Sequence, residues 1–321
     1  MQCCQLALST IDLTRTHWWY QRALGFAAAG ERRERGGPAF AAVPGLPECS
    51  LDVWCLVGRQ PFMQIEMIQF TRPIMRPRRP SWRRSDIGYS TVGIHVPDFD
   101  AAVDRVHMLG GDFITEPIGT FGKRRVCLFD PDDTLIELME DSPAGSLAAS
   151  PERQASPAIA CVSLTVRNID RALRFWADVL RCERARDTLV HTAEHEDLWG
   201  LNDAVRETAV VRTGDVLLEF VQYSSPRSRN HPAGYMLSDQ GILNVAFGTT
   251  DKTEFDDLYR RANAHGFKGH VEPWTVPGVA TVVYLTDPQG FSVELLHVDP
   301  EAMERMGFVP TVTSEPTPTH A

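Results

Sequence analysis

Four glutamates stand in the same setting, each inside a short apolar stretch typical of a β-strand. The stretches are residues 64–67 (QIEM), 135–138 (LIEL), 217–220 (LLEF) and 292–295 (SVEL). An ionised carboxylate costs several kcal/mol to bury unless it is hydrogen-bonded, ion-paired or bound to a cation. Successive glutamates are 71, 82 and 75 residues apart. This spacing indicates a unit of roughly 70 to 80 residues that occurs four times, with a carboxylate for proton transfer or cation binding in each.

The start of each unit supports the repeat independently, because a strand runs there into a helix cap. The strands and caps are residues 5–8 before Asp12, 91–94 before Asp98, 161–164 before Asn168 and 244–247 before Asp251. Asp and Asn suit the N-cap, where the side-chain oxygen accepts a free backbone N–H, and Asp251 with Glu254 resembles a capping box. Gly25, Gly110 and Gly266 are expected to end three of the four helices.

The remainder of each unit has the composition of strands. Residues 279–285 and 291–297 are rich in β-branched and aromatic residues and flank the turn sequence 287–290 (DPQG), and residues 130–133 (DPDD) repeat that turn in the second unit. In units one and three the hairpin falls at Gly58 and Gly214. The pattern predicts an α+β fold of four βαβββ modules, in which odd and even modules differ and therefore form a duplicated pair.

The length of 321 residues, with 43% hydrophobic and 23% charged residues, is typical of a two-domain globular protein. We place the first domain at residues 1–141, with modules at 3–70 and 89–140, and a linker rich in Ser, Ala and Pro at 142–157. The second domain covers residues 158–300, with modules at 159–223 and 240–298. Residues 301–321 form a C-terminal tail, which we expect to be partly disordered from Pro310 onward.

Composition also limits the compartment and the partners. The seven cysteines form no C-x-x-C pair, so we expect neither a zinc knuckle nor a disulfide framework and predict a cytoplasmic protein. We expect no signal peptide, no membrane span and, from the net charge of −10, no nucleic-acid partner. The one basic cluster, residues 72–84, contains interleaved prolines, and we interpret it as a solvated connector in preference to an anion-binding strip.

These motifs resemble the vicinal oxygen chelate superfamily, which includes glyoxalase I, bleomycin-resistance proteins and extradiol dioxygenases. The opening strand and helix (residues 6–26) and the closing hairpins (residues 130–138 and 287–295) carry the resemblance, which extends over nearly all of residues 3–299. The resemblance implies that modules pair into two open barrels, each a cup with ligands from the first and last strand of two modules. It does not imply one activity, because members of this fold catalyse unrelated reactions or only bind.

The resemblance further implies a site for one divalent metal (Mn, Mg, Fe, Co, Ni or Zn) and no organic cofactor. The expected metal ligands are Gln5, Glu66, Glu137, Glu219, Asn244 and Glu294, and the two weaker ligand positions are Thr91 and Cys161. If modules pair within each domain, Gln5, Glu66, Thr91 and Glu137 share a cup; if they pair crosswise, the better set is Gln5, Glu66, Asn244 and Glu294. Metal-free members also exist, and in them each glutamate would be hydrogen-bonded or paired with an arginine.

No histidine occupies any of the eight positions, which disfavours an extradiol-type dioxygenase, because such iron sites use two histidines and a carboxylate. His95 lies four residues beyond Thr91 on the same strand face and could replace the missing ligand. Residues 191–196 form a loop that we interpret as solvated, although it could also cover a cup. We expect substrate-binding residues at His95, His191, His195, Trp199, Tyr223 and Tyr284, and we interpret Cys161 as a small buried residue.

The leading hypothesis is a glyoxalase-like enzyme of small-molecule metabolism that moves a proton at a carbon next to a carbonyl, as an isomerase, epimerase or lyase. Glu66 or Glu137 would be the base. The alternative is a metal-free binding or resistance protein with the same cup. The substrate is expected to carry adjacent oxygens or an aromatic group. The sequence leaves open the module pairing, the active cup, and whether the chain is a monomer or a homodimer.

Overall fold

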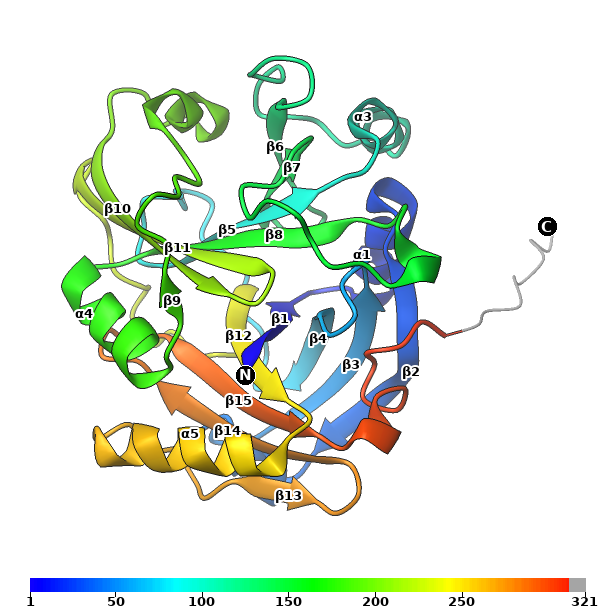
Figure 1. The fold of residues 1–321 in the computed structure, drawn as a ribbon, viewed down its shortest axis with the longest axis vertical. Helices are drawn as coiled ribbons and strands as arrows, with labels where there is room; N and C mark the ends of the chain where they lie inside the picture. The colour runs from blue at the N-terminus through cyan, green and yellow to red at the C-terminus, as the bar shows by residue number, and fades with distance from the viewer. Residues whose placement is uncertain (312–321) are drawn as a thin grey trace.

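The computed structural model describes residues 1–311 and contains four modules with the predicted order of elements (Figure 1). Module 1 comprises β1 (Gln2–Ser9), α1 (Leu13–Trp19), the π-helical η1 (Tyr20–Leu24), β2 (Ala27–Gly36), α2 (Pro38–Ala42), β3 (Ser50–Val57) and β4 (Gln64–Arg72). Module 2 comprises β5 (Gly88–His95), α3 (Phe99–Met108), β6 (Arg125–Phe129) and β7 (Leu135–Met139). Its remaining predicted strand is reduced to two isolated bridges, at Phe113 and Ile118.

Modules 3 and 4 repeat this plan, and a short helix, η2 (Pro151–Arg153), precedes module 3. Module 3 comprises β8 (Ala158–Thr165), α4 (Ile169–Leu173), η3 (Arg174–Val179), β9 (Glu183–Arg184), η4 (Ala193–Trp199), β10 (Val205–Thr213) and β11 (Val216–Ser225). Module 4 comprises β12 (Gly241–Thr249), α5 (Lys252–Ala264), β13 (Trp274–Val276), β14 (Ala280–Thr286), β15 (Ser292–Val298) and η5 (Pro300–Ala302). No helix within residues 1–311 is long and apolar enough to cross a membrane.

All four predicted N-caps are confirmed. The side chain of each cap residue accepts a backbone N–H from the first helical turn; the caps are Asp12, Asp98, Asn168 and Asp251. The capping box at Asp251 does not form, because the Glu254 carboxylate contacts the N-terminal ammonium of Met1.

The predicted helix ends are confirmed as well. Gly25, Gly110 and Gly266 all have positive φ angles. Arg181 takes the same left-handed conformation, at φ 61°, where the third module lacks a glycine.

The modules pair crosswise into two sheets. One sheet has the strand order β13-β14-β15-β12-β1-β4-β3-β2, and the other has the order β6-β7-β5-β8-β11-β10-β9. Antiparallel pairs β1–β12 and β5–β8 join the modules at the centre of each sheet. Module 1 therefore shares a sheet with module 4, and module 2 with module 3, so each sheet takes one module from residues 1–141 and one from residues 158–300.

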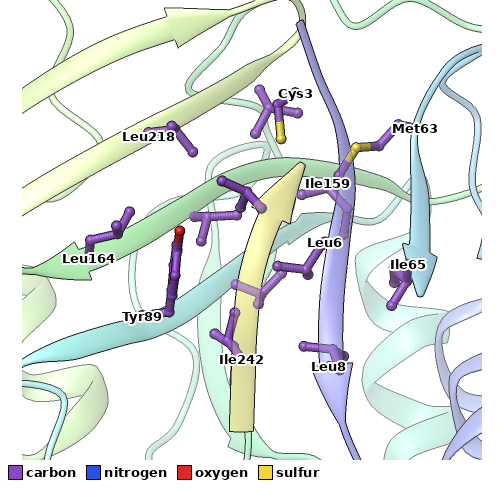
Figure 2. Packing of buried hydrophobic residues seen from close by; sticks show 14 of the residues in the cluster. Cys3, Leu6, Leu8, Met63, Ile65, Tyr89, Ile159, Leu164, Leu218 and Ile242 are labelled. Carbon is purple, nitrogen blue, oxygen red and sulfur yellow. The ribbon is translucent and has the colours of Figure 1, made fainter. Parts of the chain in front are cut away.

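The main hydrophobic core contains residues from both sheets and from the helices. Figure 2 shows part of it, with Leu6, Tyr89, Leu164, Leu218 and Ile242 gathered between the central strands. Helices α1, α3, α4 and α5 contribute their apolar faces to the same cluster. Since side chains alternate along a strand, every second residue of the central strands enters this core and the others face away from it.

Residues 301–311, which we expected to belong to the tail, pack against module 1. Phe308 is buried, and Thr311 donates its backbone N–H to the Ala28 carbonyl at 2.8 Å. Arg33 donates to the Arg305 carbonyl at 2.6 Å. The disorder predicted from Pro310 concerns mainly residues 312–321, which lie outside the described residues.

Candidate functional site

Strand alternation places all four glutamates on the sheet faces that point away from the main core. The neighbours of each glutamate along its strand belong to that core, for example Ile65 and Met67 beside Glu66. We call the face with Glu66 and Glu294 the first cup, and the face with Glu137 and Glu219 the second cup. The crosswise pairing thus assigns the four carboxylates to two pairs.

In the first cup one amide joins the two carboxylates. Gln5 Nε2 donates to Glu66 Oε2 at 2.9 Å and to Glu294 Oε2 at 3.3 Å. Asn244 is the module 4 counterpart of Gln5. It lies close to Glu66, because Ala7 of β1 pairs with Glu66 on one side and with Asn244 on the other. Four predicted oxygen ligands, Gln5, Glu66, Asn244 and Glu294, therefore lie together at the centre of this sheet.

The electrostatics of this cup are those of two carboxylates without enough positive charge. Burial and the charge of Glu66 raise the pKa of Glu294 to about 8. Burial also raises the pKa of Glu66, and Arg33 and Arg35 oppose that shift only in part. Glu294 is 5% exposed, whereas Glu66 is only partly buried. The pair therefore holds a proton at neutral pH in the absence of a cation.

Tyr284 and Asn244 complete the polar surface of the first cup. Tyr284 is the cross-strand neighbour of Glu294, and burial and the Glu294 charge raise the pKa of its hydroxyl well above the usual range. Asn244 is fully buried and lies against Tyr284 and Glu294, but neither its Oδ1 nor its Nδ2 has a well-aligned hydrogen bond within residues 1–311. A buried amide with such poor bonding is costly, which agrees with a ligand that completes its bonding.

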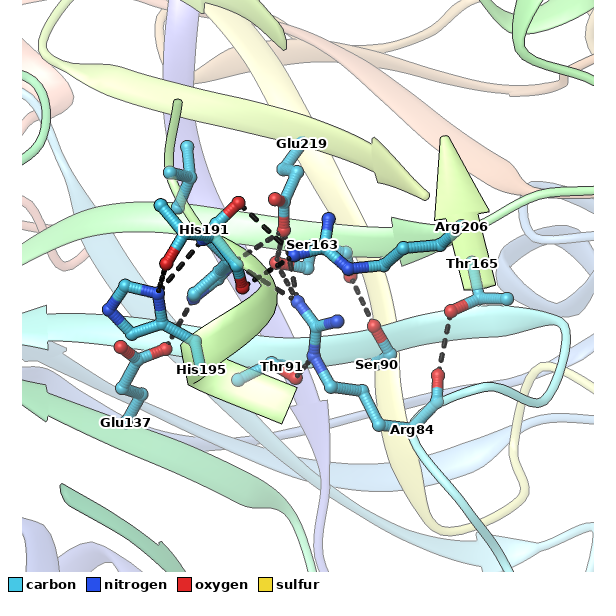
Figure 3. Close-up of polar contacts among 12 residues, drawn as sticks. Arg84, Ser90, Thr91, Glu137, Ser163, Thr165, His191, His195, Arg206 and Glu219 are labelled. Carbon is cyan, nitrogen blue, oxygen red and sulfur yellow. Dashed lines mark hydrogen bonds and ion pairs between the residues drawn. The ribbon is translucent and has the colours of Figure 1, made fainter. Parts of the chain in front are cut away.

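In the second cup a histidine bridges the two carboxylates (Figure 3). His191 Nε2 lies 2.6 Å from Glu137 Oε2, and His191 Nδ1 lies 2.6 Å from Glu219 Oε2. Burial alone would lower the pKa of His191, but the two carboxylates outweigh it and raise the pKa. Both ring nitrogens then carry protons and donate to the carboxylates.

Arg84 completes the neutralisation of the second cup. Its fully buried guanidinium donates to Glu219 Oε2 at 3.0 Å, to Thr91 Oγ1 at 2.9 Å and to Ser163 Oγ at 3.1 Å. Burial favours the protonated form of Glu137 and of Glu219, but the nearby cations outweigh it. His191 lowers the pKa of Glu137 to about 2. His191 and Arg84 together hold the pKa of Glu219 below its usual range. Internal cations thus neutralise both carboxylates of the second cup.

The loop that contains η4 covers the second cup, and the expectation of a solvated loop is wrong for His191 and Glu196, which are buried, whereas Thr192, Ala193 and Glu194 are exposed. Glu196 is 3% exposed and accepts from Trp199 Nε1 at 2.9 Å, and the Arg206 guanidinium pairs with it. The Trp199 ring lies 3.9 Å from the Arg84 guanidinium carbon. The buried residues of this loop thus close a network of charges.

The other expected substrate-binding residues differ in their surroundings. Tyr223 lies in the second cup and accepts from Arg84 at 2.8 Å. The ring nitrogen of His195 accepts from the Thr192 backbone N–H at 2.9 Å, and the ring lies 5.6 Å from the His191 ring. His95 lies at the far end of β5 beside Met139 and Ala158 and has no hydrogen bond to Thr91 or Glu137. Cys161 is fully buried, and burial raises the pKa of its thiol.

Three residues of the second cup were missed from the sequence. Arg84 ends the basic cluster that we interpreted as solvated, and that interpretation is wrong for this residue because its side chain is fully buried. Arg125, at the start of β6, lies 3.3 Å from Glu137. Ser163 donates to Glu219 at 2.7 Å. An arginine at the start of an otherwise apolar strand was a usable signal for Arg125.

The first cup fits a hard divalent cation. Its two carboxylates and two side-chain amides can supply oxygen donors, which suit Mg²⁺ or Mn²⁺, once the Gln5 amide turns its oxygen toward the cation in place of the Nε2 that it now presents. The raised carboxyl pKa values and the poorly bonded amide of Asn244 agree with a missing positive charge at this place. No group of three or more His, Cys, Asp or Glu within residues 1–311 is placed to hold a metal, so the two amides are essential to such a site.

The chain matches the profile of the Glyoxalase/Bleomycin resistance protein/Dioxygenase superfamily over residues 4–138 and 158–295. The chain therefore belongs to this superfamily. It is similar in structure to glyoxalase I from Zea mays, at 18% sequence identity and a TM-score of 0.60, with 92% of each chain covered. It is also similar to a putative dioxygenase from Bacillus subtilis, at 13% identity and a TM-score of 0.61, with 96% of this chain and 86% of that chain covered. No curated protein matches the chain.

Proposed function

We propose that the first cup is the reactive site of an enzyme that moves a proton at a carbon next to a carbonyl. The observation that carries the proposal is the pair Glu66 and Glu294, joined by Gln5, in a cup whose negative charge Arg33 and Arg35 offset only in part. Its counterpart in the second cup is ion-paired to His191 and Arg84. The second cup is then a structural element of the fold.

Two carboxyl groups that share a proton can serve as a base and an acid. Glu294, with its pKa of about 8, holds the proton at neutral pH, and Glu66 is the ionised partner. Glu66 is also the more exposed of the two. We assign the abstraction of the proton to Glu66 and its return to Glu294 or to the carboxyl pair as a unit. Glu137, the other base considered, is held ionised by His191 and Arg125 and is unsuited to that role.

A divalent cation bound by Gln5, Glu66, Asn244 and Glu294 would polarise the substrate carbonyl and stabilise negative charge on its oxygen. Tyr284 lies beside Glu294 and is placed to orient the substrate oxygens. Residues 301–311 pack over module 1, where Gly307 lies beside Cys55 and Gln64. The substrate class that suits the cup is a small carbonyl compound with an adjacent oxygen.

Metal content of the purified full chain is the first test. We expect one divalent cation per chain, because His191, Arg84 and Arg125 already neutralise the carboxylates of the second cup. Glu66→Gln and Glu294→Gln are expected to lose it, since each removes a charged ligand. Glu207→Gln is the matched control, because Glu207 is an exposed strand glutamate without an ion pair within residues 1–311. Two cations per chain, or retention in both cup variants, would refute the assignment of the first cup.

Proton transfer itself is tested by exchange. The chain is incubated in D₂O with 2-hydroxy carbonyl compounds and with thiol adducts of 2-oxoaldehydes, and deuterium next to the carbonyl is measured. We expect exchange with the wild-type chain and with Glu207→Gln, but not with Glu66→Gln. A metal-free chain that binds such compounds without exchange would instead favour the alternative, a binding or resistance protein.

A further inference from the structure

A cavity of about 360 Å³ lies apart from both cups, where two connectors between modules meet. The first connector is residues 73–87, and the second is residues 226–240. Each follows the last strand of one module and ends at a glycine that begins the next, Gly88 in β5 and Gly241 in β12. None of the four strand glutamates lines this cavity.

Reciprocal ion pairs hold the two connectors together. Arg76 of the first connector donates to Asp239 of the second at 3.0 Å. Arg229 of the second pairs with Asp86 of the first at 2.7 Å, and Arg79 pairs with the same carboxylate at 3.0 Å. The walls of the cavity are therefore cross-linked, and these three arginines have carboxylate partners.

Arg78 is different, because it forms no ion pair within residues 1–311, and the carboxylates that act on its charge, Asp130 and Asp133, lie beyond ion-pair distance. Within residues 1–311 no carboxylate lies within ion-pair distance of its guanidinium, and its Nη1 is buried without a hydrogen bond. The guanidinium lies over the Trp82 ring at 4.2 Å. It also packs on Gly241, where an added Cβ would lie 2.7 Å from Nη2. Leaving such a donor unpaired is costly, so an acceptor from outside the chain is expected.

Aromatic side chains form a large part of the cavity wall, beside the charged Arg76, Arg79 and Asp239. Trp82, Tyr89, Phe291, His231 and Tyr235 line it. The rings of His231 and Tyr235 stack at 3.9 Å, and burial lowers the pKa of His231 to about 4, so this imidazole is neutral at neutral pH. The volume is at the lower end of the range for small-molecule sites.

We propose that this cavity binds a small aromatic oxyanion, with its carboxylate or phosphate on Arg78 and its ring against the aromatic wall. The planar guanidinium can donate two parallel hydrogen bonds to either anion. The site joins both sheets, since β5 belongs to one and β12 to the other. It is independent of the chemistry of the first cup.

Calorimetric titration of the full chain tests the proposal with benzoate, phenyl phosphate, benzyl alcohol and acetate. We expect one binding site per chain for benzoate or phenyl phosphate. The compound that binds with the higher affinity shows whether the site prefers a carboxylate or a phosphate. Benzyl alcohol lacks the charge and acetate lacks the ring, so both should bind weakly. Arg78→Gln should weaken binding of the preferred anion by about tenfold or more, while Arg78→Lys should weaken it less.

Arg72→Gln is the matched control, because Arg72 lies just before the same connector, is exposed and does not line the cavity. Circular dichroism establishes that the variants are folded. Absence of binding by the wild-type chain, equal binding of benzyl alcohol, or a folded Arg78→Gln variant with unchanged affinity would each overturn the proposal. Glu66→Gln should leave this binding unchanged, so the outcome does not depend on the proposed enzyme activity.

Discussion

Replacement of Arg84 by methionine is the most direct test of the idea that internal cations fill the second cup. The guanidinium is fully buried and donates to Glu219, Thr91, Ser163 and Tyr223. Methionine keeps much of the side-chain length but removes the charge and every donor. Glu219 then keeps only His191 and Ser163 as partners.

The expected cost is about 3–5 kcal/mol in the free energy of unfolding, the range for breaking a buried ion pair by removing one partner. It is a large share of the roughly 5–15 kcal/mol that stabilises an ordinary domain. Guanidinium chloride titration followed by tryptophan fluorescence measures it. The double variant Arg84→Met/Glu219→Gln should be more stable than Arg84→Met alone, because it no longer buries an underpaired carboxylate.

An exposed arginine provides the control. Arg186→Met should change the free energy of unfolding by no more than about 0.5 kcal/mol. A loss below about 1 kcal/mol in Arg84→Met, or a double variant no more stable than that single variant, would refute the view that Arg84 neutralises the cup. Metal bound by the second cup of Arg84→Met would support it further.

Three further outcomes are expected. First, all seven cysteines are buried, so a thiol reagent should leave the native chain unlabelled, and mass spectrometry measures this. Second, Gly307→Ala should expose Cys55 to that reagent, because φ is +86° at Gly307 and an added Cβ would lie 2.7 Å from Cys55 Cβ. Third, stability should decrease when the pH is raised from 6.5 through the raised pKa of His191. Stability should also decrease when the pH is lowered from 4.5 through the pKa of Glu137 at about 2, and urea unfolding across pH measures both effects.

The controls for these outcomes come from the same chain. Gly278→Ala has a comparable positive φ of +68° but no atom within 4 Å of the added Cβ, so it should leave Cys55 unlabelled. His191→Gln should reduce the alkaline loss of stability and retain a loss in acid, because Glu219 and Glu137 stay paired with arginines. The alkaline loss that remains belongs to Glu294, whose raised pKa of about 8 acts in the same direction. Equal labelling in both glycine variants, or an unchanged alkaline loss in His191→Gln, would contradict these explanations.

Much of the fold follows from local rules that a single chain displays. Period-two alternation placed Glu66 and its three counterparts opposite the apolar face, and Asp12 and the other caps marked the helix starts. Both signals depend on neighbours within a few residues, so the sequence carries them directly. The loop around His191 was assigned to the surface because its burial depends on partners that are distant in sequence.

The sequence by itself determined four carboxylate-bearing modules and the superfamily they resemble. Only the tertiary structure decided which carboxylates share a cup, because that depends on strand pairing between distant residues. The pair β1–β12 joins residues more than 200 positions apart, and the pair β5–β8 joins residues about 70 positions apart. It also decided that Arg84 and His191 neutralise one pair while Glu66 and Glu294 keep only Gln5 between them. Charges that are alike in sequence thus acquire different pKa values, since burial and partners at a few ångströms, rather than neighbours along the chain, set the electrostatic energy.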